Sequence, residues 1–425
     1  MLSISNLREQ SFLVYGLGLS GRSVVKYFKR MKIKNYKVWD DKKKKIFKSK
    51  RTKNLDKVLR DVDYIVLSPG ISLIEKKFLM RFKKKIISDI DLIYLTNKNF
   101  ESIVVTGTNG KSTTCKLINH VLKKNGFKVL LGGNIGTPIL DLKIKKNSYV
   151  IIEASSFQLS HSQFIRPSYA FLLNITNDHL DWHGNWQNYL KSKFKIFNLQ
   201  KKDQFAIVNK DLEKIFKKKF FSSKLIIPRK KKYKKIKYKI KNYYLKLSIN
   251  DENMNFVYTL SRLLRISEKN FIKAISSFTG LSHRYEIFLK KKNITFINDS
   301  KATSFVSAKY ALLNSKNVYW ILGGLPKKND QIILTGIKKN IIKTYLIGNH
   351  TRFFRKQIKN KINFSNTNNL KEALIEIFKD LKFSNMKEKT ILLSPAAASY
   401  DQFENFEKRG NEFKKLSKLY ARKFI

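Results

Sequence analysis

Cysteine is almost absent from this chain of 425 residues, and Cys115 is the only one. A single cysteine excludes an internal disulfide framework and any cysteine-rich zinc site. The chain also lacks a run of about 18 apolar residues, the length that a membrane-spanning helix needs. Its start does not have the charged-then-apolar order of a signal peptide. These absences predict a soluble, cytoplasmic protein with no membrane partner.

Acidic residues are scarce as well. The chain has 31 Asp and Glu against 88 Lys and Arg, which gives a net charge of +57. Such a charge is typical of nucleic-acid-binding proteins, but Lys far outnumbers Arg, the residue that makes bidentate base contacts. Ile, Asn, Phe and Tyr are also abundant, and they share A/T-rich codons with Lys. We therefore interpret the excess as surface lysine set by genome composition, with no specific nucleic-acid partner.

This interpretation makes a prediction about salt. Any affinity of the protein for DNA or RNA should be independent of sequence and should fall steeply as salt rises, because counterion release is its only source. Filter binding or anisotropy over a salt series measures this. Sequence-selective binding that persists at physiological salt would contradict the interpretation.

The densest lysine run spans residues 230–246, KKYKKIKYKIKNYYLK with its flanking lysine. Lys alternates there with Tyr and Ile, and a period of two predicts amphipathic strands with Lys facing outward. A platform on which single-stranded bases stack is the alternative.

Length and pattern together predict the domain organisation. At roughly 150 residues per domain the chain corresponds to about three domains, and its 42% apolar residues suffice for packed cores. In each third, short apolar runs alternate with helical patterns, which predicts parallel α/β sheets. We place the domains at 1–97, 98–280 and 281–425.

The predicted elements locate the sites. Because ligands of open α/β sheets bind beyond the carboxyl ends of strands, polar clusters after strands are the first candidates. The predicted helices are 22–31, 268–277, 305–313, 370–381 and 402–422, with a further long helix after residue 110. The predicted strands are 11–15, 36–39, 63–67, 102–106, 128–131, 149–152, 170–173, 204–208, 294–297, 318–322, 344–347 and 390–393.

A glycine-rich loop joins strand 102–106 to the long helix. It reads Gly107-Thr108-Asn109-Gly110-Lys111-Ser112-Thr113, and its backbone N–H groups and the helix N-terminus suit a phosphate. Lys111 can reach the β- and γ-phosphates, and the hydroxyl of Ser112 or Thr113 can bind Mg²⁺. The loop is shorter than the usual form of this motif, and an ordinary glycine turn with an exposed lysine is the alternative.

A second glycine turn follows the first strand. Gly16, Gly18 and Gly21 have the spacing of a dinucleotide fingerprint, and Asp40 and Asp41 end the next strand. This pattern fits Asp40 on a ribose. Alone it indicates a turn that tolerates phosphate, and beside the first loop it suggests two different nucleotide ligands.

Polar side chains also follow two strands of the central part. Glu153 ends strand 149–152, where a carboxylate in the same sheet as a phosphate loop can hold Mg²⁺. Asp178, His179 and Asp181 follow strand 170–173. We interpret them as metal or phosphate ligands, because they lie on the same sheet edge. A buried structural histidine is the alternative for His179.

Taken together, these motifs resemble the Mur ligase family, in the family's order and from Gly16 to Glu412. The start GLGLSG and the end SPAAASYDQF are most similar to the members that add D-glutamate. The matching stretches are TGTNGKST, EASSFQL, NITNDHLDWHG, FTGLSHRYE, NDSKATS and LLSPAAASYDQFENFEKRGNEF.

The resemblance implies an α/β fold of three domains. These are a Rossmann-like N-terminal domain for a UDP precursor, a central P-loop-type ATPase with a mostly parallel sheet, and a Rossmann-like C-terminal domain for an amino acid. It implies an ATP-dependent ligase, acting as a monomer, that joins D-glutamate to UDP-MurNAc-L-alanine. The substrate carboxylate takes the γ-phosphate of ATP, and the D-glutamate amine then attacks the acyl phosphate. Lys111 and two Mg²⁺ ions would supply the positive charge that this step requires.

The resemblance also implies roles for residues. Lys111, His179 and Lys193 would be catalytic, with Lys193 as a carbamylated lysine. ATP would contact Gly107, Thr108, Asn109, Gly110, Lys111, Ser112, Thr113, Asn250, Asn253, Arg284 and Asp299. The metal ligands would be Ser112, Thr113, Glu153, His179 and Lys193. The UDP substrate would contact Leu17, Ser20, Asp40, Asp41, Lys42, Ser68, Pro69, Gly70 and Asn134.

For D-glutamate we predict a pocket in the third domain, at or after strand ends. Lys327 would pair with one carboxylate, and the hydroxyls of Ser399 and Thr303 would bind the other. Phe406 would form an apolar wall. Phe406 lies seven residues after Ser399, about two helical turns, so both could share one face of the closing helix.

Two departures from the family pattern affect these assignments. Ile249 replaces a usual histidine before the second asparagine, and Leu325-Pro326 precedes two lysines, so that Lys327 or Lys328 could act. Two other functions remain open. The chain could be another Mur ligase or a folylpolyglutamate synthase-type ligase, against which its start and end argue. It could also be a basic nucleic-acid-binding module on a decayed scaffold, which its intact motifs disfavour.

Overall fold

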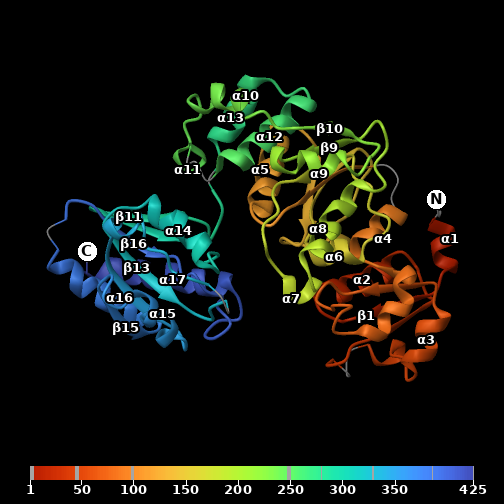
Figure 1. The fold of residues 1–425 in the computed structure, drawn as a ribbon, viewed down its shortest axis with the longest axis horizontal. Helices are drawn as coiled ribbons and strands as arrows, with labels where there is room; N and C mark the ends of the chain where they lie inside the picture. Colours follow the sequence, from red (N-terminus) through yellow and green to blue (C-terminus); the bar gives the residue numbers. More distant parts are fainter. Residues whose placement is uncertain are drawn as a thin grey trace. The chain divides into compact units, whose positions relative to one another are not determined.

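The computed structural model describes residues 4–43, 47–96, 100–246, 250–278, 280–327, 330–384 and 386–424. The chain forms two compact units, 1–278 and 279–425. Unit 1 contains two sheets and unit 2 contains one (Figure 1). The α/β fold is confirmed, while the predicted domain boundaries at 97 and 280 stay predictions.

The first sheet is parallel, with strand order β2-β1-β3-β4. Buried apolar side chains on both faces explain why its strands have continuous hydrophobic runs. Its strands are β1 (Phe12–Tyr15), β2 (Tyr36–Trp39), β3 (Tyr64–Leu67) and β4 (Ile86–Ile87), and its helices are α1 (Ile4–Glu9), α2 (Leu19–Arg30), α3 (Leu55–Asp61) and α4 (Asp89–Thr96).

The second sheet is also parallel, with strand order β10-β9-β8-β5-β7-β6. Its strands are β5 (Phe100–Thr106), β6 (Val129–Gly133), β7 (Ser148–Glu153), β8 (Tyr169–Leu172), β9 (Phe205–Val208) and β10 (Lys224–Ile226). Its helices are α5 (Lys111–Lys124), α6 (Ser156–His161), α7 (Leu180–His183), α8 (Trp186–Phe194), α9 (Glu213–Lys217), α10 (Lys230–Lys237), α11 (Tyr243–Lys246), α12 (Asp251–Leu263) and α13 (Glu268–Ser276).

The third sheet has strand order β11-β12-β16-β13-β14-β15, and only its edge strand β11 is antiparallel. Helices cover both faces: α14 and α15 pack on one, α16 and α17 on the other. Its strands are β11 (Glu286–Lys291), β12 (Ile294–Asn298), β13 (Val318–Gly323), β14 (Ile341–Ile347), β15 (Phe364–Asn368) and β16 (Lys389–Leu393). Its helices are α14 (Phe305–Leu313), α15 (Thr351–Ile358), α16 (Leu370–Lys382) and α17 (Phe406–Phe424).

The lysine-rich run contradicts the prediction of strands, because it contains helices α10 and α11. Tyr233, Ile236 and Ile240 are buried, and their spacing of three and four matches one helical face. Ion pairs from Lys237 to Asp251 and from Lys239 to Glu268 attach the segment to its neighbours. Burial of Tyr233 also argues against the stacking platform.

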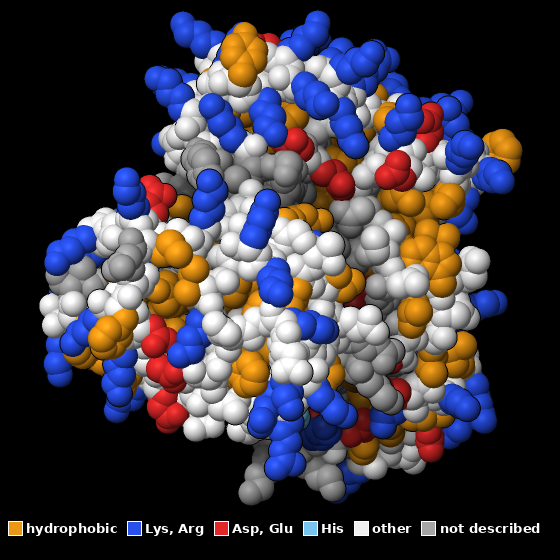
Figure 2. Space-filling view, turned by 60° about the vertical axis from the view of Figure 1, so that its left-hand side comes forward, with side chains coloured by type: hydrophobic (Ala, Val, Ile, Leu, Met, Phe, Trp, Pro, Cys, Tyr) orange, Lys and Arg blue, Asp and Glu red, His pale blue; other side chains and the backbone are white. Residues whose placement is uncertain are grey.

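Lysine and arginine side chains are scattered over the visible face in Figure 2, with acidic side chains between them. They are not gathered over one element, as an electrostatic binding stripe would require. In the part of the chain that the structure describes, no helix is both long and apolar enough to cross a membrane.

Candidate active site

The glycine-rich loop lies between β5 and α5, as predicted. Gly110 is the N-cap of α5 and has a positive φ of 83°, which glycine adopts at little cost. A Cβ at Gly110 would stand 2.3 Å from Oδ1 of Asn253. The loop therefore needs glycine at this position for both its backbone and its close contact with α12.

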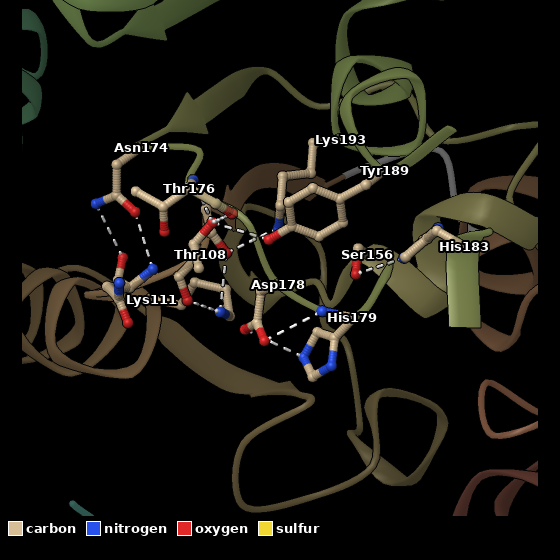
Figure 3. Close-up of polar contacts among 12 residues, drawn as sticks. Thr108, Lys111, Ser156, Asn174, Thr176, Asp178, His179, His183, Tyr189 and Lys193 are labelled. Atoms are coloured by element: carbon tan, nitrogen blue, oxygen red, sulfur yellow. Dashed lines mark hydrogen bonds and ion pairs between the residues drawn. The ribbon is translucent and has the colours of Figure 1, made fainter. Parts of the chain in front are cut away.

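Neighbouring elements hold the loop in shape. The N–H of Thr108 donates to the carbonyl of Asn174 at 2.9 Å, and the N–H of Asn109 donates to its Oδ1 at 2.8 Å. The Thr108 hydroxyl lies 2.8 Å from the hydroxyl of Tyr189 on α8 (Figure 3). Asn174 and Tyr189 were not predicted as site residues, although Asn174 directly follows a predicted strand.

Two lysines meet at the carbonyl of Gly107. Nζ of Lys111 donates to it at 2.9 Å and to the carbonyl of Thr108 at 2.7 Å, while Nζ of Lys193 donates to it at 2.8 Å. Lys193 is 1% exposed. Its burial, with the nearby charge of Lys111, holds the pKa of Lys193 well below its usual range. A buried ammonium beside a second cation is costly, so this site favours an uncharged or modified amine.

Glu153 is the last residue of β7 and pairs in register with Val105 of β5. It is buried, and its Oε1 accepts from Nδ2 of Asn134 at 3.2 Å. Its Oε2 is buried with no hydrogen-bond partner among the described residues. An orphaned carboxylate oxygen near a phosphate loop fits a cation, because an unpaired buried charge is otherwise unfavourable.

His179 lies in the loop after β8 and is the N-cap of α7. Its side chain is 44% exposed, which argues against a buried structural histidine. Nε2 of His179 is 3.4 Å from Oδ2 of Asp178 (Figure 3). The centre of the His179 ring lies 4.7 Å from that of Phe157. β7 and β8 flank β5, so Glu153 and His179 share one sheet edge with the loop.

The donors fit Mg²⁺ that is shared with a nucleotide. Among the residues described, no three His, Cys, Asp or Glu side chains form a site that could hold a metal by themselves. Mg²⁺ in nucleotide sites takes one or two carboxylates together with phosphate oxygens and water. Buried hydroxyls of Ser112 and Thr113 at the start of α5 are further possible donors.

The two asparagines assigned to ATP lie at the start of α12. Asn250 is its N-cap, and Asn253 accepts from the Thr114 hydroxyl at 3.2 Å. Both are buried. The structure thus places Asn253 against α5, the helix that follows the glycine-rich loop. Ile249, the departure from the family pattern, lies outside the described residues.

The residues assigned to the UDP substrate lie around the first glycine turn, except Asn134, which follows β6 in the second sheet. A Cβ at Gly21 would stand 1.8 Å from the carbonyl oxygen of Gly16, which explains this glycine. The Ser68 hydroxyl donates to the same carbonyl at 2.8 Å. Leu17, Asp40, Asp41 and Lys42 lie at the ends of β1 and β2, while Ser20 lies on α2 and Pro69 and Gly70 follow β3.

Asp40 organises this edge. Oδ2 of Asp40 accepts from the N–H of Leu17 at 2.6 Å, and its Oδ1 accepts from the N–H groups of Lys42 and Lys43. Asp41 instead accepts from Tyr15 and Trp39 and pairs with Lys76 at 3.0 Å. The prediction that Asp40 binds a ribose stays a prediction. In the structure, the Asp40 carboxylate holds the backbone at Leu17, in the first glycine turn, and at Lys42 and Lys43.

Unit 2 places Arg284 and Asp299 together beside β12. Asp299 follows β12, and its carboxylate accepts from the N–H of Tyr285 at 3.0 Å and from the Ser394 hydroxyl at 2.7 Å. Burial raises the pKa of Asp299 to about 7, although these bonds and the charge of Arg284 oppose the rise. Nε of Arg284 is buried, and none of the described residues forms a hydrogen bond with it.

The raised pKa predicts a pH-dependent stability. An unfolded Asp ionises near pH 4, whereas folded Asp299 keeps its proton up to about pH 7. Stability is therefore lost as pH rises through this window, by on the order of 4 kcal/mol at most. Asn does not ionise, so Asp299→Asn should not lose stability in this window. In ligand-free protein, the Tm of the variant relative to that of the wild type should therefore rise from pH 4 to pH 7. The control Asp203→Asn changes an exposed carboxylate, so its Tm should run parallel to that of the wild type over this pH range. A parallel Tm profile for Asp299→Asn would contradict the prediction.

The four residues predicted to bind D-glutamate follow three neighbouring strands. Thr303 follows β12, Lys327 follows β13, and Ser399 and Phe406 follow β16. Leu325 and Ala398 exchange two backbone hydrogen bonds of 2.9 Å, which join the loops of Lys327 and Ser399. The predicted placement at one sheet edge is thus observed. Lys328 lies outside the described residues.

One part of that prediction is wrong. Helix α17 begins at Phe406, so Ser399 lies outside it and the two do not share a helical face. The carbonyl of Ser399 accepts from the N–H groups of Gln402 and Phe403 in a separate turn. Oδ1 of Asn405 accepts from the N–H of Lys408 and caps the helix, a signal that sequence analysis overlooked.

Lys301 and His283 were not predicted. Nζ of Lys301 lies 4.8 Å from the centre of the Phe406 ring, and the His283 ring lies 6.1 Å from it. One indication of Lys301 was present in the sequence, which is its position between the predicted site residues Asp299 and Thr303. These contacts set the orientation of Phe406.

Comparison with known proteins agrees with this architecture. The family model of the Mur ligase middle domain matches residues 105–276. A UDP-N-acetylmuramoylalanine–D-glutamate ligase of Rickettsia felis is 38% identical, over 97% of this chain and 98% of its own length.

Two solved structures share the fold. MurF ligase of Thermotoga maritima, in complex with ADP, has a TM-score of 0.54 and 15% identity and covers 100% of this chain and 97% of its own. A bifunctional folylpolyglutamate synthase/dihydrofolate synthase of Yersinia pestis, complexed with AMPPNP and a Mn ion, has a TM-score of 0.52 and 12% identity, covering 82% and 99%. Full-length similarity to the Rickettsia enzyme, together with the matched middle domain, establishes that this chain belongs to the Mur ligase family.

Proposed function

We propose that this protein is a UDP-N-acetylmuramoylalanine–D-glutamate ligase, which acts in peptidoglycan precursor synthesis. The observation that supports it most strongly is the 38% sequence identity, over 97% of this chain, to a ligase of that name. The phosphate loop, the orphaned Glu153 carboxylate and the glycine-constrained first turn support the same function. Because it would consume ATP and a UDP-linked precursor, we expect it in the cytoplasm. The monomeric state stays a prediction.

The first chemical step needs concentrated positive charge, because the substrate carboxylate attacks an anionic γ-phosphate. In our proposal the N–H groups of the Gly107–Thr113 loop bind the ATP phosphates. The ammonium of Lys111 moves from the carbonyls of Gly107 and Thr108 onto the transferred phosphate. Glu153, His179 and the hydroxyl of Ser112 or Thr113 would hold Mg²⁺, which supplies further charge neutralisation when bound.

Lys193 completes this centre as a carbamate in our proposal. Its uncharged amine would add to CO₂ and release one proton, which turns a neutral buried group into an anion. Its position at the carbonyl of Gly107, beside Lys111, supports this assignment. Carbamate oxygens are suitable Mg²⁺ ligands, whereas an ammonium is not.

In the second step of the proposed reaction, the amino acid is the nucleophile. The D-glutamate amine attacks the acyl phosphate and expels phosphate, forming the amide bond. Lys327 would pair with one glutamate carboxylate, while Thr303 and Ser399 donate to the other and Phe406 packs on its methylenes. Arg284 and Asp299 would contact ATP from unit 2.

Phosphate release from ATP tests the proposal. We expect release that requires both UDP-MurNAc-L-alanine and D-glutamate, and a mass increase of the UDP product by one glutamyl residue. L-Glutamate, L-alanine, meso-diaminopimelate and a D-alanyl dipeptide serve as controls, with the precursor that each related ligase would use. Activity only with another pair, or only with a folate and L-glutamate, would overturn it.

A further inference from the structure

Arg409 lies on the first turn of α17 and is 1% exposed. Its Nε donates to the Ser300 hydroxyl at 3.0 Å. Its Nη2 donates to the carbonyls of Ser300 at 2.8 Å and Ala397 at 2.9 Å. Burial lowers the pKa of Arg409 to about 10, so it stays charged at neutral pH. Among the described residues Arg409 donates only to neutral groups, although the charge of Asp401 lies close enough to favour the charged form. A buried charge without a bonded counter-ion is expensive, so a role other than stability is the better explanation for Arg409.

The partners of Arg409 explain its position. Ser300 lies in the loop after β12, and Ala397 lies in the loop after β16. The loop after β13 lies nearby, because a Cβ added at Gly324 would stand 3.0 Å from Nη1 of Arg409. One planar guanidinium thus bonds to the loops after β12 and β16 and packs close to the loop after β13, with spacings that a flexible ammonium could not reproduce.

Those three loops present the residues that we assign to D-glutamate. Thr303 follows Ser300, Lys327 follows Gly324, and Ser399 follows Ala397. The Ser300 hydroxyl, which Arg409 contacts, donates in turn to the carbonyl of Phe406 at 2.9 Å. Fixing the guanidinium therefore fixes the separations among all four groups.

We propose that Arg409 is a positioning residue for the amino-acid pocket, which sets the spacing of the three loops without touching the substrate. The inference rests on the proposed function. It predicts a loss that is largest for D-glutamate, because Arg409 holds the loops that carry the pocket residues. The phosphate loop and the UDP-substrate residues belong to unit 1, and of the residues assigned to ATP only Asp299 adjoins a partner of Arg409.

The test compares Arg409→Met, which keeps the apolar stem, with Arg409→Lys and with the control Lys408→Met. Lys408 lies on the same helix and is exposed. Its variant removes one positive charge, as Arg409→Met does, but no buried contact. We expect Arg409→Met to raise KM for D-glutamate about 10- to 100-fold, with KM for ATP and for the UDP substrate little changed. Arg409→Lys should be intermediate, and Lys408→Met should resemble the wild type.

Several results would overturn the inference. A merely structural arginine would lower Tm and the active fraction while leaving every KM unchanged. Equal rises in all three KM values would also contradict it. If Arg409→Met does not fold, Ser300→Ala removes one contact and should raise KM for D-glutamate in the same direction, and no rise there overturns the proposal. If the wild type itself does not use D-glutamate, the proposed function fails instead.

Discussion

Replacing Lys193 with alanine should reduce kcat by at least about 10²- to 10³-fold, the effect typical of losing one preorganised electrostatic group. The side chain is buried, and its Nζ reaches the carbonyl of Gly107, the first residue of the phosphate loop. A carbamate there would present anionic oxygens to Mg²⁺ beside the cation Lys111. Alanine would remove those oxygens and leave a cavity next to the loop.

Steady-state kinetics at saturating substrates measures this loss, and a ¹³C carbamate signal after ¹³CO₂ exposure reports the modification independently. Lys191→Ala is the matched control, because Lys191 is an exposed lysine on the same helix. Added short carboxylates should partly restore the turnover of Lys193→Ala. Full activity of Lys193→Ala would refute the assignment, and Lys193 would then be a structural lysine that braces Gly107.

Lys327→Ala should raise KM for D-glutamate far more than KM for ATP. A substrate carboxylate without its cation in a closed site costs on the order of 2–5 kcal/mol, which is at least about 30-fold in affinity. The loop of Lys327 is firmly held: Leu325 pairs with Ala398, and the Asp330 carboxylate accepts from the N–H of Phe305 at 2.7 Å. The variant should therefore lose the charge without releasing the loop.

Lys328→Ala is the natural comparison, since it removes the same charge one residue further along. If Lys328→Ala gives the glutamate phenotype and Lys327→Ala does not, the assignment is displaced by one residue. If neither variant changes KM for D-glutamate, the pocket lies elsewhere. Melting temperatures of both variants distinguish lost binding from lost folding.

Sequence by itself determined the local features. Outside the lysine-rich run 230–246, every predicted strand is present in the structure. Central strands such as β1 and β13 are buried along their whole length and therefore have continuous apolar runs, which are visible in the sequence without any partner. The loop from Gly107 to Thr113 was predictable, since its glycines and its place between a strand and a helix are sequence properties. The resemblance, in turn, named Lys193 and Glu153 without showing their surroundings.

Tertiary structure decided what depends on distant residues. The segment 230–246 has alternation suited to strands, yet burial of Tyr233 and Ile236 against neighbouring helices makes it helical. Edge strands such as β11 and β15 lack full burial and so lack the apolar run that predicts them. The bonds of Asn174 with Asn109, Lys193 with Gly107 and Arg409 with Ser300 join residues 65 to 109 positions apart. Only the packing of sheets and helices brings such groups within hydrogen-bond distance, because sequence periodicity describes one element and not the neighbours it will meet.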